Sequence, residues 1–161
     1  MTDSKEYFEY LRQRSKLGLL YREFWLYPRL CKVLHGRALD VGCGVGDMLA
    51  FRPNTVGVDI NPKTVEWCKA QDLNVHLMEI DRLPFTEQTF DSVIFDNVLE
   101  HIEEPEAILI EIHRVLAEQG LLVVGVPGTL GYSTDPDHKI FYTKEKLVKT
   151  ITRFGFVVDD L

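Results

Sequence analysis

The order of apolar and polar positions divides the chain into a helical first part and an alternating remainder. Between residues 5 and 34, apolar side chains such as Phe8, Leu20 and Phe24 recur at three- and four-residue steps. This spacing is typical of an amphipathic helix. We expect that helix to break near Gly18, because glycine weakens a helix interior.

From residue 37 onward, short apolar runs alternate with segments of helical spacing. The predicted strands are residues 37–42, 55–60, 74–80, 90–96, 121–127 and 156–160. The predicted helices between them are residues 47–51, 61–71, 105–120 and 143–155. Strands that alternate with helices in this way imply βαβ units and a mostly parallel sheet. Four of the strands are nearly continuous apolar runs, which indicates that helices cover both faces. The predicted fold class is therefore a doubly wound α/β sheet.

The length of 161 residues is enough for one domain with a substantial core. The sequence contains no internal repeat, low-complexity stretch or interdomain linker. We therefore predict a single domain over residues 1–161, with a helical cover in 1–35 and the α/β core in 36–161. The longest irregular segment, residues 127–142, is expected to be functional or mobile.

Three glycines follow the first predicted strand, in the stretch "ALDVGCGVGD". Gly42, Gly44 and Gly46 stand between that strand and the next helix, where the chain must turn sharply. The amide groups of a helix N-terminus can bind a ligand there, and ligands bind at this end of an open α/β sheet. One glycine suffices for a turn, so three of them indicate a ligand-binding loop.

The spacing of these glycines argues against a dinucleotide as the ligand. A dinucleotide site has the pattern G-x-G-x-x-G, whereas Asp47 occupies the sixth position here. Asp40, just before the loop, would repel a pyrophosphate but suits an ammonium group. Asp59 ends the second predicted strand, where it is placed to accept both hydroxyls of a ribose. A ribose joined to a zwitterion fits this pattern.

The net charge of −7 argues against a general nucleic-acid or anionic-membrane binder. Residues 1–37 nevertheless carry eight Lys and Arg against four Asp and Glu. We interpret them as a basic helical layer on an acidic domain; the alternative is a basic patch that attracts an anionic acceptor. No apolar run approaches the roughly 18 residues of a membrane span.

The cysteines favour a cytoplasmic location. Cys31, Cys43 and Cys68 are isolated and odd in number, which is typical of reduced thiols. Residues 1–10 also lack the charged-then-apolar pattern of a secretory signal.

Three stretches in order, "ALDVGCGVGDML", "VGVDI" and "FDSVIFDNVLEHI", resemble the class I S-adenosylmethionine-dependent methyltransferases. They are similar in particular to the small-molecule branch that includes the ubiquinone and sugar methyltransferases. The resemblance covers residues 36–158 and implies a Rossmann-like sheet with S-adenosylmethionine as the cofactor. It also implies methyl transfer to an oxygen or nitrogen of a small-molecule acceptor.

The resemblance assigns the cofactor's methionine and ribose to the first two strand ends. The loop Gly42–Gly46, which includes Cys43, would back the methionine part, with Asp40 near its amino end. Asp59 would hold the ribose, and Ile60 would flank the adenine.

The segment "EIDRLPF" resembles the family's acidic segment after the third strand. Asp81 would hydrogen-bond the adenine amino group, with Arg82 beside it and Leu83 packed on the ring. Asn97, at the end of the fourth strand, would line the methionine moiety. Structural interpretations stay open: Asp81 can open the turn before Pro84, and Asn97 can cap the following segment.

A hydroxyl or ammonium acceptor must lose a proton, and histidine has a suitable pKa for taking it. His101 follows the fourth predicted strand and can face the mouth of the site. In the segment 127–142 the family often has a histidine and an aromatic residue over the acceptor, which points to His138 and Tyr142. These three residues are the catalytic candidates. Tyr21 and Tyr27, on the N-terminal helices, are expected to pack in the core rather than close the cofactor pocket.

We expect no metal site. Glu100, His101, Asp135, Asp137 and His138 could supply ligands, but no two of them have a firm ligand spacing. Magnesium, which some methyltransferases use, also prefers carboxylates to imidazole.

Two other functions remain open at this point. An NAD-dependent oxidoreductase would need the third glycine and room for a substrate domain. A non-catalytic binding or interaction protein would keep the cofactor pocket without a complete acceptor site.

The resembling family usually has seven strands in the order 3-2-1-4-5-7-6, with strand seven antiparallel. Here strand six would be residues 156–160, and the sequence given ends at Leu161. We therefore expect strand seven to be missing and the order to be 3-2-1-4-5-6. The alternative leaves the edge of 121–127 open, where a second copy could pair to form a homodimer. We also expect the chain to be a shortened form of a longer protein.

Overall fold

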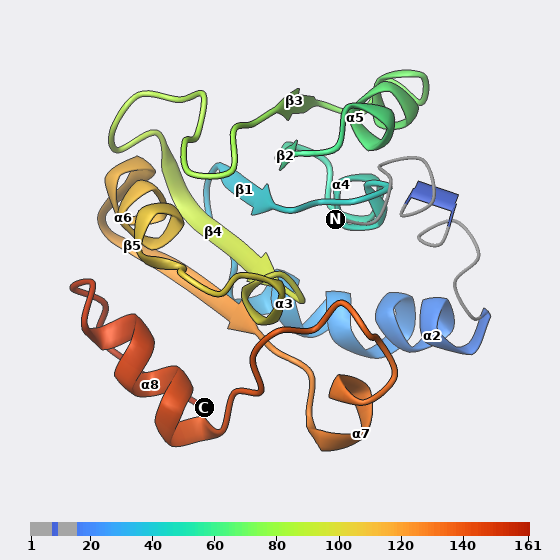
Figure 1. Ribbon diagram of the computed structural model, residues 1–161. Coiled ribbons are helices and arrows are strands. Elements are labelled where there is room, and N and C mark those ends of the chain that lie inside the picture. Colours follow the sequence, from blue (N-terminus) through green and yellow to red (C-terminus); the bar gives the residue numbers. More distant parts are fainter. Residues whose placement is uncertain (1–7, 10–15) are drawn as a thin grey trace.

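A five-stranded sheet in the order β3-β2-β1-β4-β5 forms the centre of the computed structural model, which describes residues 8–9 and 16–161 (Figure 1). The strands are β1 (Ala38–Val41), β2 (Thr55–Asp59), β3 (Val75–Leu77), β4 (Phe90–Asp96) and β5 (Leu116–Gly125). All neighbouring strands are parallel. Every residue of β1 and β2 is buried, as expected for strands covered on both faces. The predicted α/β fold class is confirmed.

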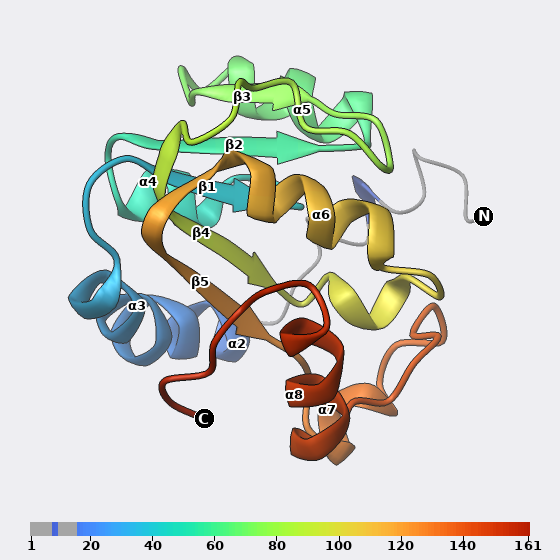
Figure 2. The same cartoon turned by 90° about the vertical axis from the view of Figure 1, so that its left-hand side faces the viewer.

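Helices lie on both faces of the sheet (Figure 2). They are α2 (Lys16–Tyr21), the π-helical segment η1 (Arg22–Leu26), α3 (Tyr27–Val33), α4 (Asp47–Phe51), α5 (Pro62–Lys69), the short 3-10 helix η2 (Leu99–His101), α6 (Glu106–Val115), α7 (Thr129–Tyr132) and α8 (Lys144–Thr152). On one face, α6 packs Leu109 and Ile112 into the main core. On the other face, α3 and α4 pack Tyr27 and Met48 against Ile94 of β4. The sheet is therefore doubly wound.

The N-terminal helix does not break at Gly18. Its described part runs from Lys16 to Val33, and the irregularity comes later, as the π-helical segment Arg22–Leu26. Extra residues in a π-turn re-aim side chains and are frequent at functional sites. Here the segment places the guanidinium of Arg22 3.9 Å from the carboxylate of Asp96. The predicted helical residues 5–7 and 10–15 lie outside the described part of the chain.

Helix α6 ends earlier than the sequence predicted, at Val115 rather than Gly120. The carbonyl groups of Arg114 and Val115 accept hydrogen bonds from the amides of Gln88 and Thr89. This pairing draws the chain into the sheet, so that β5 begins at Leu116. Gly120 lies within that strand instead of closing the helix.

The predicted sixth strand is wrong, and so is the order 3-2-1-4-5-6. Residues 156–161 form no strand, and β5 is the last strand of the described sheet. Both views place α8 beyond β5, at that edge of the sheet (Figures 1 and 2). The chain turns at Gly155, which has a φ of 89°. Phe156 then packs against His113 of α6, with ring centroids 5.4 Å apart, instead of entering the ladder.

None of the helices in residues 8–9 and 16–161 is long and apolar enough to cross a membrane.

Candidate active site

A cavity of about 630 Å³ opens at the carboxyl ends of β1, β2 and β4. Its walls come from these strand ends, from Arg22 and Tyr27 of the N-terminal helix, and from residues 127–139. A volume in this range suits a ligand the size of a nucleoside derivative. The position is the one expected for the ligand site of an open α/β sheet.

The glycine loop follows β1, and all three of its glycines have positive φ: 76° at Gly42, 52° at Gly44 and 82° at Gly46. A Cβ at Gly42 would lie 2.5 Å from a methyl group of Val98. One at Gly46 would lie 2.6 Å from Leu73. These two glycines thus let the loop pack closely against the protein itself. Gly42 and Gly44 line the cavity together with Cys43, whereas Gly46 is buried outside it.

Asp59, at the end of β2, fixes the shape of this loop. Its Oδ2 accepts a hydrogen bond from the amide of Gly44 (2.9 Å), and its Oδ1 accepts one from the amide of Asn61 (2.8 Å). The residue is 6% exposed and lines the cavity. Burial raises the pKa of Asp59, and the two amide donors counteract this. A carboxylate held by two amides keeps lone pairs for a ligand's hydroxyl groups.

Asp40, at the third position of β1, is also buried and lines the same cavity. Burial and the nearby charges of Asp96 and Asp59 raise the pKa of Asp40 to about 7, although Arg22 lowers it. Burial likewise raises the pKa of Asp96, which ends β4. Three carboxyl groups from neighbouring strand ends therefore converge on one cavity, with Arg22 as their nearby cation. A positively charged ligand would be stabilised here.

The predicted adenine-binding residues are only partly brought to the cavity. Ile60 lines it and is 54% exposed. Asp81 and Arg82 are exposed and lie outside the cavity wall. Leu83 is buried in the main core, where its amide donates to Glu111 (2.9 Å).

Met78 and Ile80 supply the apolar wall that we had expected from Leu83. The sequence placed both residues inside the predicted third strand, residues 74–80, but β3 ends at Leu77 and both follow it, so the predicted strand is too long.

Asn97 lines the cavity directly after β4. Its φ of 55° is left-handed, a conformation that asparagine tolerates better than most residues. Its amide donates to the carbonyl of Gly125 (2.9 Å), which continues the pairing of β4 with β5.

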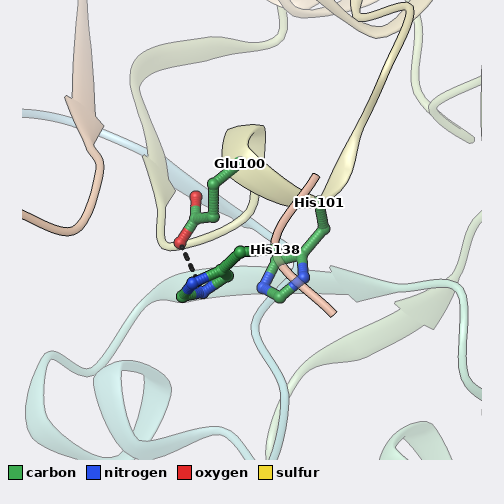
Figure 3. Close-up of side chains that lie close together, drawn as sticks. All are labelled: Glu100, His101 and His138. Carbon is green, nitrogen blue, oxygen red and sulfur yellow. Dashed lines mark ion pairs between the residues drawn. The ribbon is translucent and has the colours of Figure 1, made fainter. Parts of the chain in front are cut away.

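Beyond Asn97, the cavity wall contains Glu100, His101 and His138 (Figure 3). The Nε2 atom of His138 lies 3.7 Å from Oε1 of Glu100, and the rings of the two histidines are 4.8 Å apart. Glu100 is fully buried, and burial raises its pKa to about 7. Burial lowers the pKa of His101, so its neutral form is favoured. The structure thus brings together two catalytic candidates and one residue that was considered only as a metal ligand.

Tyr142 does not join this group. It is 6% exposed, belongs to the main core, and lies outside the cavity wall. The aromatic residue beside His138 is instead Tyr132 of α7, whose ring stacks on that imidazole at 5.2 Å. Tyr27 is buried in a core cluster, as expected, but it also lines the cavity. Tyr21 is 51% exposed and lies outside the cavity wall, so the expectation that it packs in the core is wrong.

Sequence reasoning missed Arg22 and Glu100 as members of the site. Arg22 had no signal, because only the π-helical segment turns it toward Asp96. For Glu100 a weak signal existed: it is an acid beside His101, directly after an apolar strand.

The side chains that line the cavity fit the chemical groups of S-adenosylmethionine. Asp40 and Asp96 suit the cofactor's positive charges, Asp59 suits the ribose hydroxyls, and Ile60, Met78 and Ile80 offer an apolar surface for the adenine. No feature of the loop offers cations for a pyrophosphate.

A protein-family comparison matches residues 39–124, more than half of the chain, to the methyltransferase domain family. A probable S-adenosylmethionine-dependent methyltransferase of Mycolicibacterium smegmatis is 28% identical over 167 residues, which covers 92% of this chain and 65% of that protein. A ubiquinone/menaquinone biosynthesis C-methyltransferase of Desulfotalea psychrophila is 29% identical over 98 residues, with 55% and 40% coverage. The chain thus spans less than two thirds of the length of these relatives.

Among solved structures, the fold is similar to an S-adenosylmethionine-dependent methyltransferase of Thermotoga maritima, described as a possible histamine N-methyltransferase. The TM-score is 0.82 at 22% identity, covering 98% of this chain and 82% of that one. A methyltransferase of Archaeoglobus fulgidus gives a TM-score of 0.68 at 23% identity, with 89% and 75% coverage. S-adenosylmethionine is the cofactor that this family implies. With the glycine loop, the parallel sheet and the family match in agreement, the chain belongs to the methyltransferase domain family.

Proposed function

We propose that the protein transfers a methyl group from S-adenosylmethionine to an oxygen or nitrogen atom of a small-molecule acceptor. The observation that carries this proposal is the convergence of Asp40, Asp59 and Asp96 on one cavity beside the glycine loop. When bound, the cofactor supplies an electrophilic methyl group on a sulfonium.

Different residues along the cavity would bind different parts of the cofactor. Asp59 would bind the ribose, and its two amide contacts would keep the loop in place for the methionine part. Asp40 would lie near the amino group, with Asn97 beside it. Asp81 stays a candidate for the adenine amino group, although its exposed position favours a contact made from outside the cavity.

The acceptor would bind at the end of the cavity formed by Glu100, His101 and His138. One of these groups would act as the general base that accepts the proton lost by a hydroxyl or ammonium acceptor. The relatives differ in acceptor: one is called a C-methyltransferase and another a possible histamine N-methyltransferase. Their names therefore do not select the acceptor of this chain.

The competing functions make different predictions for the same cavity. A non-catalytic binding protein would bind the cofactor without turnover. An oxidoreductase would bind NAD, which the three carboxyl groups disfavour by repelling its pyrophosphate.

Two further proposals concern the setting. A cytoplasmic location is supported by Cys31, Cys43 and Cys68, which are all free thiols. Pairing of two copies along β5 is also proposed, because β5 is the last strand of the described sheet, although it requires α8, which lies beyond this edge, to leave the strand accessible. Sedimentation equilibrium over a range of concentrations would test the pairing, and a monomer at every concentration would contradict it.

The experiment for the proposed function is turnover with S-adenosylmethionine that carries a labelled methyl group. The purified chain is incubated with pools of phenols, alcohols and amines, and labelled products are identified by mass spectrometry. We expect a labelled product with the wild type and strongly reduced labelling with His138→Ala. Tight cofactor binding without any labelled product would favour the non-catalytic alternative.

A further inference from the structure

We propose that Glu100, His101 and His138 bind one divalent transition-metal ion at the acceptor end of the cavity. One ligand atom from each residue lies within 4.8 Å of the other two (Figure 3). Glu100 and His101 come from η2, whereas His138 comes from the segment before α8. Our expectation of no metal rested on ligand spacing along the sequence and on the preference of magnesium for carboxylates. The fold brings together residues 37 positions apart.

Glu100 points most directly to a missing ligand. Its side chain is fully buried, and neither carboxylate oxygen accepts a hydrogen bond from another residue in the described part of the chain. Nε2 of His138 lies 3.7 Å from Oε1 of this carboxylate. A buried carboxylate that accepts no hydrogen bond from a neighbouring residue is costly, and a cation between it and the imidazoles would offset that cost.

Both histidines are oriented as metal ligands usually are. Nδ1 of His138 lies 2.8 Å from the carbonyl oxygen of Tyr132, and Nδ1 of His101 lies 3.3 Å from that of Asp137. A carbonyl oxygen only accepts, so each Nδ1 carries the proton and each neutral ring keeps its lone pair on Nε2. Such a hydrogen bond to a backbone carbonyl fixes the tautomer and the ring orientation of a metal-binding histidine.

The backbone holds the two segments together independently of any ion. The carbonyl of Glu100 accepts hydrogen bonds from the amides of Lys139 (2.8 Å) and Ile140 (3.0 Å). The ring of Tyr132 also stacks on that of His138, with ring centroids 5.2 Å apart. The three ligands are therefore positioned before metal binding, which lowers the entropic cost of assembling the site.

Two imidazoles and one carboxylate select the class of ion. This set suits Zn²⁺, Fe²⁺ or Co²⁺, whereas Mg²⁺ and Ca²⁺ prefer oxygen ligands. Bonds of about 2.0–2.2 Å to Zn²⁺ place ligand atoms about 3.5 Å apart in a tetrahedral site. The 3.7 Å between Glu100 and His138 is close to this value. Three protein ligands also leave a coordination position open, as in catalytic zinc sites.

This site deepens the proposed function, on which the next step rests, by favouring a hydroxyl acceptor over an amine. An amine has a single lone pair, so coordination to the ion would block its attack on a methyl group. A hydroxyl oxygen keeps further lone pairs after it binds, and the ion would lower its pKa so that its proton passes to solvent water. The oxygen would then form the bond to the methyl group as the methyl–sulfur bond breaks, and the cofactor would leave as its demethylated product. The two histidines would then act on the acceptor through the ion rather than as free bases.

The test is metal binding by the purified apo-protein, which needs no acceptor and no turnover. Zn²⁺ and Co²⁺ are titrated into the wild type and into Glu100→Gln, His101→Ala and His138→Ala, with calorimetry for Zn²⁺ and visible absorption for Co²⁺. His76→Ala is the matched control, because His76 is an exposed histidine on β3 outside the cavity wall. Circular dichroism checks that each variant is folded. If Glu100→Gln does not fold, the comparison rests on His101→Ala and His138→Ala.

We expect one ion per chain and a loss of affinity of at least about 10–100-fold in each site variant, with His76→Ala unchanged. Phenol added to the Co²⁺ form is expected to shift the absorption bands as an oxygen enters the open position. Absence of stoichiometric binding, or equal binding by the site variants and the control, would overturn the site. An unchanged Co²⁺ spectrum with phenol would overturn the hydroxyl assignment. Binding of the demethylated cofactor product is measured separately, so that failure of the proposed function shows independently of the metal result.

Discussion

At the scale of single residues, the carboxyl groups at the strand ends determine what the cavity can bind. Asp40 and Asp59 were recognisable in the sequence because each ends or nearly ends an apolar strand, where parallel strands present their side chains to ligands. Arg22 and Met78 were not recognisable, since a π-helical turn and an irregular segment position them.

Replacing Asp59 by Ala is expected to weaken binding of S-adenosylmethionine and of its demethylated product by about 1.5–3 kcal/mol, the range for a hydrogen bond to a charged group. The variant also loses the contacts that hold Gly44 and Asn61. Calorimetric titration measures the change, with Asp159→Ala as a control of equal charge on an exposed residue. If a folded Asp59→Ala protein bound both ligands with unchanged affinity, the assignment of Asp59 to the ribose would be wrong.

The raised pKa of Asp40 gives a prediction for stability against pH. Its pKa is about 7 in the folded state against an ordinary value of 3.8. Between these values the folded state binds more protons than the unfolded state, so the free energy of unfolding must fall as pH rises. Asp40→Asn is expected to flatten this decline between about pH 4 and pH 7. The carboxyl groups of Asp96 and Asp59 stay in both proteins, and their charges contribute to the raised pKa of Asp40, so the difference reports Asp40 together with its coupling to these two groups.

Urea denaturation at a series of pH values compares wild type, Asp40→Asn and the exposed control Asp159→Asn. Parallel profiles for the wild type and Asp40→Asn would show that Asp40 does not titrate in this window.

At the scale of elements, the segment between β5 and α8 separates two residues that the sequence could not distinguish. His138 and Tyr142 are four positions apart in a stretch without periodicity. The backbone bonds from Lys139 and Ile140 to Glu100 turn His138 toward the cavity, and Tyr142 continues into the core. Such turns depend on contacts with distant residues, which local patterns do not contain.

His138→Ala is therefore expected to reduce turnover far more than cofactor affinity, because His138 lies at the proposed acceptor end and Asp59 at the proposed ribose end of the same cavity. Single-turnover rates and calorimetric dissociation constants separate the two effects. Equal losses in both would show that the segment serves the cofactor instead.

Tyr142→Ala should act on stability. Removal of a large buried aromatic side chain costs about 3–5 kcal/mol, so the midpoint of urea denaturation should fall while Tyr142→Phe stays close to wild type. If Tyr142→Phe lost turnover at unchanged stability, the hydroxyl of Tyr142 would have a role in catalysis, contrary to this account.

The boundaries of the elements likewise agree with the sequence where local patterns determine them and differ where contacts with distant residues do. Strand β4 and the N-cap of α8 at Thr143 lie where the sequence predicted them. The end of α6 does not, because hydrogen bonds from Gln88 and Thr89 override local spacing. The N-terminal helix ends within one residue of its predicted end, but its irregularity lies at Arg22–Leu26 and not near Gly18.

At the scale of the whole molecule, the order of the first five strands could be predicted. Three connections, β1–β2, β2–β3 and β4–β5, are crossovers between neighbouring strands. The longer step from β3 to β4 follows the strand order of the resembling family. The fate of residues 156–161 could not. An apolar "FVV" fits a strand as well as a docking segment, and only the packing of Phe156 on His113 decides between them.

The central claim is that this cavity is built for S-adenosylmethionine, and parallel calorimetric titrations with S-adenosylmethionine and NAD test it most directly. The account predicts binding of one S-adenosylmethionine per chain and no measurable binding of NAD. Binding of NAD, or absence of S-adenosylmethionine binding by a folded protein, would contradict it.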